Sequence, residues 1–227
     1  MRIAPEGWPF IAGGLLLVMV LGVGGFLVSG RASALGTWLA AGAVLMAVLT
    51  VFTAWFFRDP IRSNRAGAHD VLAPGDGRIL QITEVEEPVF LRGPALRISI
   101  FLSIFNVHVQ RAPITGKVGL RDYKAGGFRA AWHPRASEEN EQATLGIASE
   151  PHRVLVRQIA GLVARRVVTD PREGDALAQG SRIGLIRFGS RVDLFIPAGW
   201  ELTCRVGDRA VGGQSVMARI PAEEGEA

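Results

Sequence analysis

The sequence is poor in cysteine, histidine and lysine, and each shortage excludes a class of site. Cys204 is the only cysteine, so an internal disulfide and a cysteine-rich metal site are both excluded. The four histidines form no H-x-H or H-x-x-x-H pair, and no metal site is predicted. Lys117 and Lys124 are the only lysines, and neither stands in a recognisable cofactor-binding loop.

Common nucleotide-binding and hydrolase motifs are also missing. There is no Walker loop, no dinucleotide-binding glycine fingerprint after a strand and no G-x-S-x-G elbow. The formal charge is +4, but apart from two lysines it is carried by scattered arginines rather than by a basic cluster. Arginine suits bidentate contact with phosphate, which an anionic lipid surface also offers. RNA offers phosphate as readily, so the charge alone does not identify the partner. From the charge and the long apolar runs together, we predict a phospholipid membrane as the partner, and no nucleic acid.

Two long apolar runs stand near the start of the chain. Residues 8–29 and 34–57 contain no charged side chain, and each run is long enough to cross a hydrocarbon core of about 30 Å as a helix. Because only residues 30–33 connect them, the simplest arrangement is an antiparallel helical hairpin. A re-entrant hairpin remains an alternative, since glycines weaken the first run. So does a cleaved signal peptide, since Ala32-Ser33-Ala34 has the form of a cleavage site.

Arginines flank the two runs unevenly. Arg31 stands alone in the connector, whereas Arg2 precedes the first run and Arg58, Arg62 and Arg65 follow the second. By the positive-inside rule both chain ends face the cytoplasm. The sequence therefore predicts a protein of the inner membrane, with the part that follows the hairpin on its cytoplasmic side.

From residue 58 the pattern changes to short apolar segments separated by glycine, proline and aspartate. Residues 96–109 are apolar on both faces and rich in β-branched side chains, which predicts a strand buried on both sides. A helix is indicated only around residues 137–142. We predict a mainly β barrel or sandwich over residues 58–227, preceded by a membrane-anchoring helical hairpin over residues 1–57. Further strands are expected at 142–148, 154–168, 182–188 and 192–196.

A short internal repeat supports this β architecture. The segment from Gly174-Asp175 to Gly180 recurs as Gly207-Asp208 to Gly213, with the same spacing of its glycines and aspartate. A Gly-Asp turn that leads into a strand and then a glycine is typical of a barrel or sandwich built from hairpins.

Three separated residues are candidates for chemistry, and each also has a structural interpretation. Ser190 follows Gly189 between two apolar strand segments, where a Gly-Ser pair is often a bulge. Asp76 lies in a Pro-Gly-Asp-Gly turn, where an aspartate often caps its own turn. His108 shares a predicted strand face with Ile98 and Ile100, where a histidine is often a hydrogen-bonded core residue.

Long consecutive segments set these three residues in a wider pattern. They are APEGWPF, WFFRDP, the Pro-Gly-Asp-Gly turn, RISIFLSIFNVHVQRAP, ASEEN, QIAGLVARR and LIRFGSRVD. Taken together, these segments resemble the phosphatidylserine decarboxylases, in particular the short bacterial membrane-associated class. The resemblance covers nearly the whole chain.

The resemblance implies site residues. The family's self-cleavage site falls between Gly189 and Ser190, and the aspartate and histidine of its maturation triad fall on Asp76 and His108. Long-form members carry H-x-x-H, whereas Phe105 stands at the first of those positions here, and their L-G-S-T is replaced by Phe-Gly-Ser-Arg. Further candidates to line the substrate pocket are Phe105, Phe188, Glu139 and Asn140.

The resemblance also implies a cofactor made from the chain itself. Attack of Ser190 on the preceding carbonyl and elimination would release a large chain, 1–189, and a small chain, 190–227, which stay associated. The new amino end would carry a pyruvoyl group, a ketone that accepts electrons as CO₂ leaves. This implies decarboxylation of phosphatidylserine to phosphatidylethanolamine with neither metal nor pyridoxal phosphate. The sequence leaves open whether the protein forms a homo-oligomer.

Two alternatives remain at this point. Repeated hairpins with Gly-Asp turns also resemble biotinyl and lipoyl carrier domains and the membrane adaptors built on them, although neither lysine stands at a hairpin tip as a carrier requires. A decarboxylase of another serine-headed lipid, such as archaetidylserine, would carry the same residues. The sequence indicates no tail-binding shape that separates the two lipids.

Overall fold

The computed structural model of the chain describes residues 2–29, 34–63, 66–127, 129, 139–161, 166–187 and 190–221. Contacts divide the chain into two units, Met1–Ile61 and Arg62–Ala227, which are described separately below. Residues 58–61, predicted to open the β domain, group with the helical unit in this division.

The first unit is a pair of apolar helices. Helix α1 (Trp8–Ser29) spans the first charge-free run, and helix α2 (Ala34–Phe56) spans all but the last residue of the second, as predicted. The 3-10 helix η1 (Pro5–Gly7) leads into α1, and strands β1 (Arg2–Ile3) and β2 (Arg58–Asp59) pair antiparallel. Both long helices are long and apolar enough to cross a membrane.

Small residues let the two helices pack closely. The Cα of Gly14 faces the side chain of Thr50, and a Cβ at Gly25 would lie 3.3 Å from the backbone nitrogen of Ala40. Such glycine contacts are typical of helix pairs in lipid, where close packing replaces the hydrophobic effect as the force between helices. Large apolar side chains along both helices, such as Phe26 and Trp38, are exposed. These features suggest membrane association.

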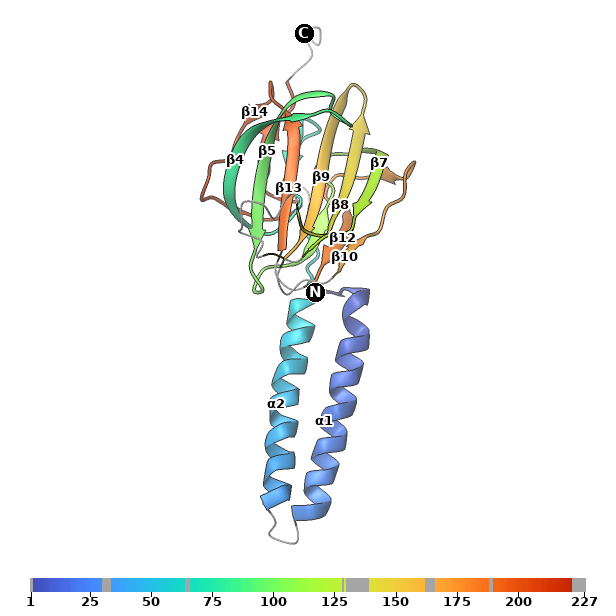
Figure 1. Cartoon of the computed structure of the whole chain (residues 1–227), viewed down its shortest axis with the longest axis vertical. Helices are drawn as coiled ribbons and strands as arrows, with labels where there is room; N and C mark the ends of the chain where they lie inside the picture. The colour runs from blue at the N-terminus through green and yellow to red at the C-terminus, as the bar shows by residue number, and fades with distance from the viewer. Residues whose placement is uncertain are drawn as a thin grey trace. The chain divides into compact units, whose positions relative to one another are not determined.

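The second unit is built around an antiparallel sheet that curls into a half-barrel (Figure 1). In spatial order its eight strands are β11 (Ala176–Leu177), β7 (Gly116–Lys124), β8 (Gln142–Ser149), β9 (His152–Ala160), β13 (Ser190–Pro197), β5 (Gly93–Leu102), β4 (Gly77–Glu87) and β15 (Arg209–Ala210). Two three-stranded sheets accompany it. Their orders are β10 (Val167–Thr169), β12 (Arg182–Ile186), β6 (Val109–Arg111) and β14 (Glu201–Leu202), β16 (Val216–Arg219), β3 (Asp70–Leu72).

One face of the eight-stranded sheet forms the main core. Along β13 the alternate residues Val192, Leu194 and Ile196 are fully buried in this core, together with Ile98 and Ile100 of the neighbouring β5. The alternation places the intervening residues of β13 on the opposite face. The mainly β fold with an N-terminal helical pair is therefore confirmed.

The prediction of a single strand over residues 96–109 is wrong. Strand β5 ends at Leu102, and a turn follows in which Asn106 Oδ1 accepts hydrogen bonds from the backbone N–H and the hydroxyl of Ser103, at 2.9 and 2.8 Å. A polar side chain that bonds the backbone within four residues favours a turn over a ladder. His108 therefore lies between β5 and β6 and not on the same strand face as Ile98.

Two further expectations need correction. The segment 154–168 contains two strands, β9 and β10, rather than one, and residues 162–165 between them lie outside the described part of the chain. The helix expected around residues 137–142 is not formed at its end, because Gln142 begins β8 and Asn140 forms a parallel bridge with Gly127. Residues 137 and 138 are not described.

The internal repeat adopts the same turn twice. Gly174 and Gly207 have φ of 91° and 94°, a conformation that glycine tolerates best. In each copy the following aspartate accepts a hydrogen bond of 2.8 Å from the backbone N–H three residues earlier, Asp175 from Arg172 and Asp208 from Arg205. The copies lead into β11 and β15, the two edge strands of the large sheet, as the hairpin interpretation predicts.

Candidate active site

Ser190 begins β13, at the centre of the large sheet. It lies opposite Leu102 of β5 on one side and Ala160 of β9 on the other. Its side chain is fully buried, and its hydroxyl oxygen has no hydrogen-bond partner among the residues that the structure describes. A buried hydroxyl without a partner is costly, which makes Ser190 unlike an ordinary core serine.

The other two candidate residues lie at the same end of the sheet. Asp76 directly precedes β4, and a Cβ on the adjacent Gly75 would lie 3.6 Å from Leu102, the strand neighbour of Ser190. His108 follows the turn that begins after Leu102, and its carbonyl accepts the backbone N–H of Ile186 at 3.3 Å. The fold thus gathers Asp76, His108 and Ser190 around the end of β5.

The carboxylate of Asp76 has two kinds of partner. Arg62 Nη1 and Nη2 donate to Oδ1 and Oδ2 at 2.5 and 2.7 Å, and the backbone N–H of Gly212 donates to Oδ1 at 2.8 Å. The ion pair is mostly buried, with side-chain exposures of 8% for Arg62 and 14% for Asp76. The side chain of Asp76 is therefore held in place by a guanidinium and a backbone N–H, and it also fixes the turn that contains Gly212.

His108 is fully buried, and its Nδ1 lies 3.0 Å from the carbonyl oxygen of Asn106. Because a carbonyl can only accept, this contact places the proton of the neutral ring on Nδ1 and leaves the lone pair on Nε2. A ring in that tautomer is prepared to accept a proton through Nε2. The orientation of His108 by Asp76 stays a prediction.

Glu139 and Asn140 lie beside the strand that flanks Ser190. Asn140 is fully buried, and its Nδ2 donates to the carbonyls of Arg129 and Ala160 at 2.8 and 2.6 Å. Glu139 forms an ion pair with the guanidinium of Arg129. Since Ala160 is the β9 partner of Ser190, Asn140 supports the backbone opposite the serine. Contact of Glu139 or Asn140 with substrate stays a prediction.

Of the remaining predicted residues, one lies in the described part of the chain and two lie outside it. Phe105 is 64% exposed at the turn between β5 and β6, so in this structure its ring faces solvent. Its contribution to the lining of the substrate pocket stays a prediction. Phe188 and Gly189 lie outside the described residues, and the cleavage site is seen only from Ser190 onward.

Sequence reasoning missed a buried ion pair directly after Ser190. Arg191 Nε donates to Asp193 Oδ1 at 2.6 Å and Arg191 Nη2 to Ser99 Oγ at 2.6 Å, with side-chain exposures of 2% and 0% for the two charged residues. Arg157 on β9 belongs to the same face, where burial lowers its pKa and the charge of Asp193 opposes that effect. The available signal was two opposite charges at alternate positions of an otherwise apolar strand.

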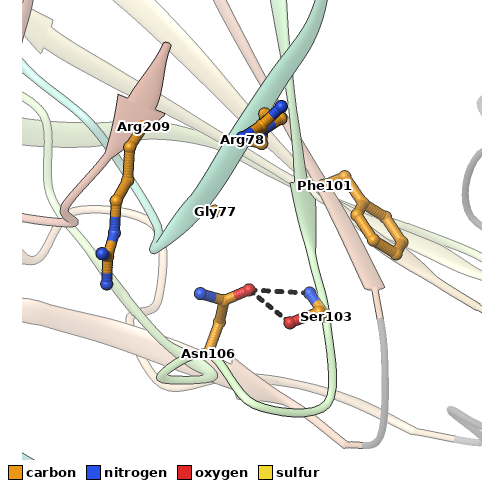
Figure 2. A pocket seen from close by; sticks show the side chains of 6 residues that line it. All are labelled: Gly77, Arg78, Phe101, Ser103, Asn106 and Arg209. Carbon is orange, nitrogen blue, oxygen red and sulfur yellow. Dashed lines mark hydrogen bonds between the residues drawn. The ribbon is translucent and has the colours of Figure 1, made fainter. Parts of the chain in front are cut away.

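A pocket of about 360 Å³ opens next to this end of the sheet (Figure 2). Its lining comprises Gly77, Arg78, Phe101, Ser103, Asn106 and Arg209. Gly77 follows Asp76, and Asn106 provides the carbonyl that contacts His108. Sequence reasoning singled out neither arginine, because each stands alone in the sequence and only strand pairing brings them together. Over the described residues, no group of three or more His, Cys, Asp or Glu side chains could hold a metal ion.

Comparison with known proteins gives consistent matches along the chain. The family model for phosphatidylserine decarboxylase matches residues 49–218. A protein of Symbiobacterium thermophilum named phosphatidylserine decarboxylase proenzyme is 49% identical over 220 residues, which cover 96% of each chain. Proteins with the same name from Salinibacter ruber and Aromatoleum aromaticum are each 42% identical, over 87% and 96% of this chain and 89% and 96% of theirs.

Proposed function

The chain belongs to the phosphatidylserine decarboxylase family, and we propose that it converts phosphatidylserine to phosphatidylethanolamine and CO₂ in phospholipid synthesis. Family membership confirms the resemblance on which the sequence interpretation depended and the prediction that the chain is an enzyme. It speaks against the carrier or adaptor alternative. The relatives are named proenzymes, so the chain is expected to be processed before it acts.

Processing starts at Ser190 in this proposal. Its hydroxyl oxygen attacks the carbonyl carbon of Gly189 and the Ser190 nitrogen leaves as an amine, which turns the peptide bond into an ester. β-Elimination then releases residues 1–189 with a carboxylate end and leaves dehydroalanine at position 190. Water hydrolyses this residue to a pyruvoyl group and ammonia. The observation that supports this most strongly is the buried serine hydroxyl, unpaired within the described residues, at the first position of a central strand. A hydroxyl paired with a backbone carbonyl would be a structural serine instead.

His108 is the proposed base for this step. Its Nε2 lone pair accepts the serine proton, while the carbonyl of Asn106 holds Nδ1 and fixes the ring. Asp76, charged and ion-paired to Arg62, supplies the negative charge that stabilises the imidazolium once it forms. His108 remains buried next to the new chain end after cleavage, where it can move protons during decarboxylation.

The strand pairings keep the two chains together after the cut. Within the small chain, β13 pairs with β5 and β9, β15 pairs with β4 and β16 pairs with β3, and all four of these partner strands belong to the large chain. Arg191 is the residue next to the new amino end, and its buried side chain is held by hydrogen bonds to Asp193 and Ser99. A pyruvoyl group at that end supplies the electron sink for decarboxylation of an amino acid head group.

The helical hairpin supports a location of this chemistry at a bilayer. Helices α1 and α2 are apolar over their whole length, and their flanking arginines favour an inner-membrane location with the catalytic domain on the cytoplasmic face. The substrate is then an anionic phospholipid taken from the same membrane. This location agrees with a substrate that does not leave the lipid phase.

The experiment that tests the proposal is mass spectrometry of the purified, denatured protein. We expect two fragments instead of one 24.3 kDa chain, the smaller starting at position 190 and carrying a carbonyl that reacts with phenylhydrazine. Ser190→Ala should give an intact and inactive chain, and His108→Ala should accumulate precursor. An active preparation that consists of intact chain would contradict the proposal.

A further inference from the structure

The pocket beside the site brings two arginines together, with no counter-ion among the described side chains. Arg78 of β4 and Arg209 of β15 are direct partners in the antiparallel pairing, and both are exposed. Neither side chain has a hydrogen bond or ion pair with any described residue, and none of the described residues that line the pocket is acidic. Like charges directly opposite each other destabilise a strand pair, so an anion between them would remove a cost.

Neutral donors complete the pocket. Figure 2 shows the Asn106 side chain with its oxygen turned toward Ser103 and its nitrogen directed away from that pair, on the side of Arg209. The hydrogen bonds to Ser103 use the amide oxygen, which leaves the amide N–H groups available to an acceptor. Two guanidinium groups and an amide suit an anion with several oxygens.

Three of the residues that line the pocket are direct neighbours of the proposed reactive residues or of the residue after Ser190. Gly77 follows Asp76 directly in the chain. Asn106 contacts the ring of His108 through its carbonyl. Phe101, which also lines the pocket, is the strand partner of Arg191, the residue after Ser190. An anion held in this pocket therefore lies close to the proposed new chain end.

We propose that Arg78 and Arg209, with Asn106, bind the phosphodiester of the phospholipid head group. This inference rests on the proposed function, because it names the part of that substrate which the pocket holds. A phosphodiester is the anionic group that any serine-headed phospholipid carries next to the reacting amino acid. Holding it fixes the head group so that its carboxylate and amine are presented to the catalytic residues.

The turn at the pocket has the polarity that a phospholipid requires. Its ends, Ser103 and Asn106, line the pocket, whereas its middle residues, Ile104 and Phe105, are 41% and 64% exposed. Polar groups thus face the phosphate site while apolar groups point outward, where acyl chains would lie. A site for free phosphate has no need of exposed apolar side chains at its mouth.

Binding to the uncleaved chain tests the subsite independently of processing. The structure is that of the precursor, so the pocket is present before cleavage. In a Ser190→Ala background we would measure the Kd of a water-soluble short-chain phosphatidylserine for the full chain in detergent. Arg78→Gln and Arg209→Gln should each raise the Kd about tenfold, since each removes a charge-assisted hydrogen bond. Arg78→Lys should recover part of the loss.

Arg172→Gln is the matched control. Arg172 is an exposed arginine before β11, at the opposite edge of the same sheet from β15. This variant should leave the Kd unchanged. Equal weakening by all three arginine variants would indicate a general charge effect and overturn the proposal.

Kinetics of the processed enzyme separate the two sources of phosphate. With soluble substrate and no bilayer, Arg78→Gln and Arg209→Gln should raise KM about tenfold and leave self-cleavage intact. If the Kd and KM for soluble substrate are unchanged and only binding to anionic vesicles falls, the arginines contact other lipids and the proposal is wrong. If the wild-type chain is not cleaved but the variants weaken binding, the subsite stands and the proposed function fails.

Discussion

Arg62 holds the carboxylate of Asp76 with both terminal nitrogens, at 2.5 and 2.7 Å. The two residues are 14 positions apart, and Arg62 also donates to the carbonyl of Gly212. A bidentate, largely buried pair fixes the carboxylate in position and orientation. This contact ties the proposed maturation residue to the segment that enters the β domain.

Arg62→Ala should slow self-cleavage and lower stability. Its loss leaves the carboxylate of Asp76 buried without its counter-ion, a change that costs about 3 kcal/mol in comparable sites. We expect precursor to accumulate on a denaturing gel during a time course of synthesis. Wild-type cleavage rate in this variant would show that Asp76 needs no ion pair to act.

Arg219→Ala is the control for the loss of an arginine ion pair. Arg219 is 58% exposed and lies 3.6 Å from Asp70, and exposed pairs contribute about 0–1 kcal/mol. Cleavage and thermal stability should both remain close to wild type. A large effect here would mean that processing is sensitive to any loss of positive charge.

The internal repeat separates the structural role of Asp76 from its charge. Asp76 Oδ1 accepts the N–H of Gly212 just before Gly213, and Thr115 Oγ1 accepts the N–H of Gln179 just before Gly180, at 3.1 Å. Both side chains thus satisfy the same backbone position in the two copies of the repeat. A neutral side chain is sufficient for this bond, so the negative charge of Asp76 has another purpose.

Asp76→Asn should fold but fail to mature. The asparagine oxygen can still accept the Gly212 N–H, whereas the charge that stabilises an imidazolium at His108 is lost. We expect a full-length chain with a circular dichroism spectrum like that of the wild type and a cleavage rate lowered by about 100-fold or more. Normal cleavage of the folded variant would limit Asp76 to its turn.

Much of the fold could be predicted because its signals are local. Helices α1 and α2 follow from uninterrupted apolar runs, and the Gly174 and Gly207 turns follow from a repeated sequence. The break after Leu102 was missed because apolar side chains predominate on both faces of the segment 96–109. The hydrogen bonds of Asn106 to Ser103, which end the strand, are not visible in hydropathy.

The site was only partly predictable for a related reason. Ser190, His108 and Asp76 stand in segments that resemble a family, so sequence alone could single them out. Arg62 and Arg209 each depend on a residue that is not a sequence neighbour. Arg62 binds Asp76, 14 positions later, and Arg209 lies opposite Arg78 in a strand pair. The pair of Arg78 and Arg209 depends on strand register and the pair of Arg62 and Asp76 on how two connecting segments pack, and a single sequence specifies neither.

Asp193→Asn should destabilise the β domain more than the loss of a surface charge does. Arg191 is 2% exposed, and in this variant its buried charge has an amide oxygen and the hydroxyl of Ser99 as neutral partners in place of a carboxylate. We expect a loss of about 3 kcal/mol in the free energy of unfolding, measured by chemical denaturation of the Ser190→Ala chain in detergent. The exposed pair of Arg182 and Asp170 provides the control, since Asp170→Asn should cost less than about 1 kcal/mol.

Cys204 should be unreactive in the folded protein. It should also make the free energy of unfolding depend on pH in the alkaline range. Burial, reinforced by the charge of Asp208, raises the pKa of the thiol from 9.0 to about 11, so the nucleophilic thiolate is scarce at neutral pH. Iodoacetamide at pH 8 should label the chain only after denaturation.

The sign of the pH effect follows from which state loses the proton first. Below pH 9 both states keep the thiol protonated, and the shift has no effect on stability. Between pH 9 and about 11 the unfolded chain releases its proton more readily, so the free energy of unfolding falls as the pH rises. Denaturation of wild type and Cys204→Ala at pH 8 and pH 10 isolates this contribution. A stability difference between the two proteins that is the same at both pH values would show that the thiol does not titrate differently on folding.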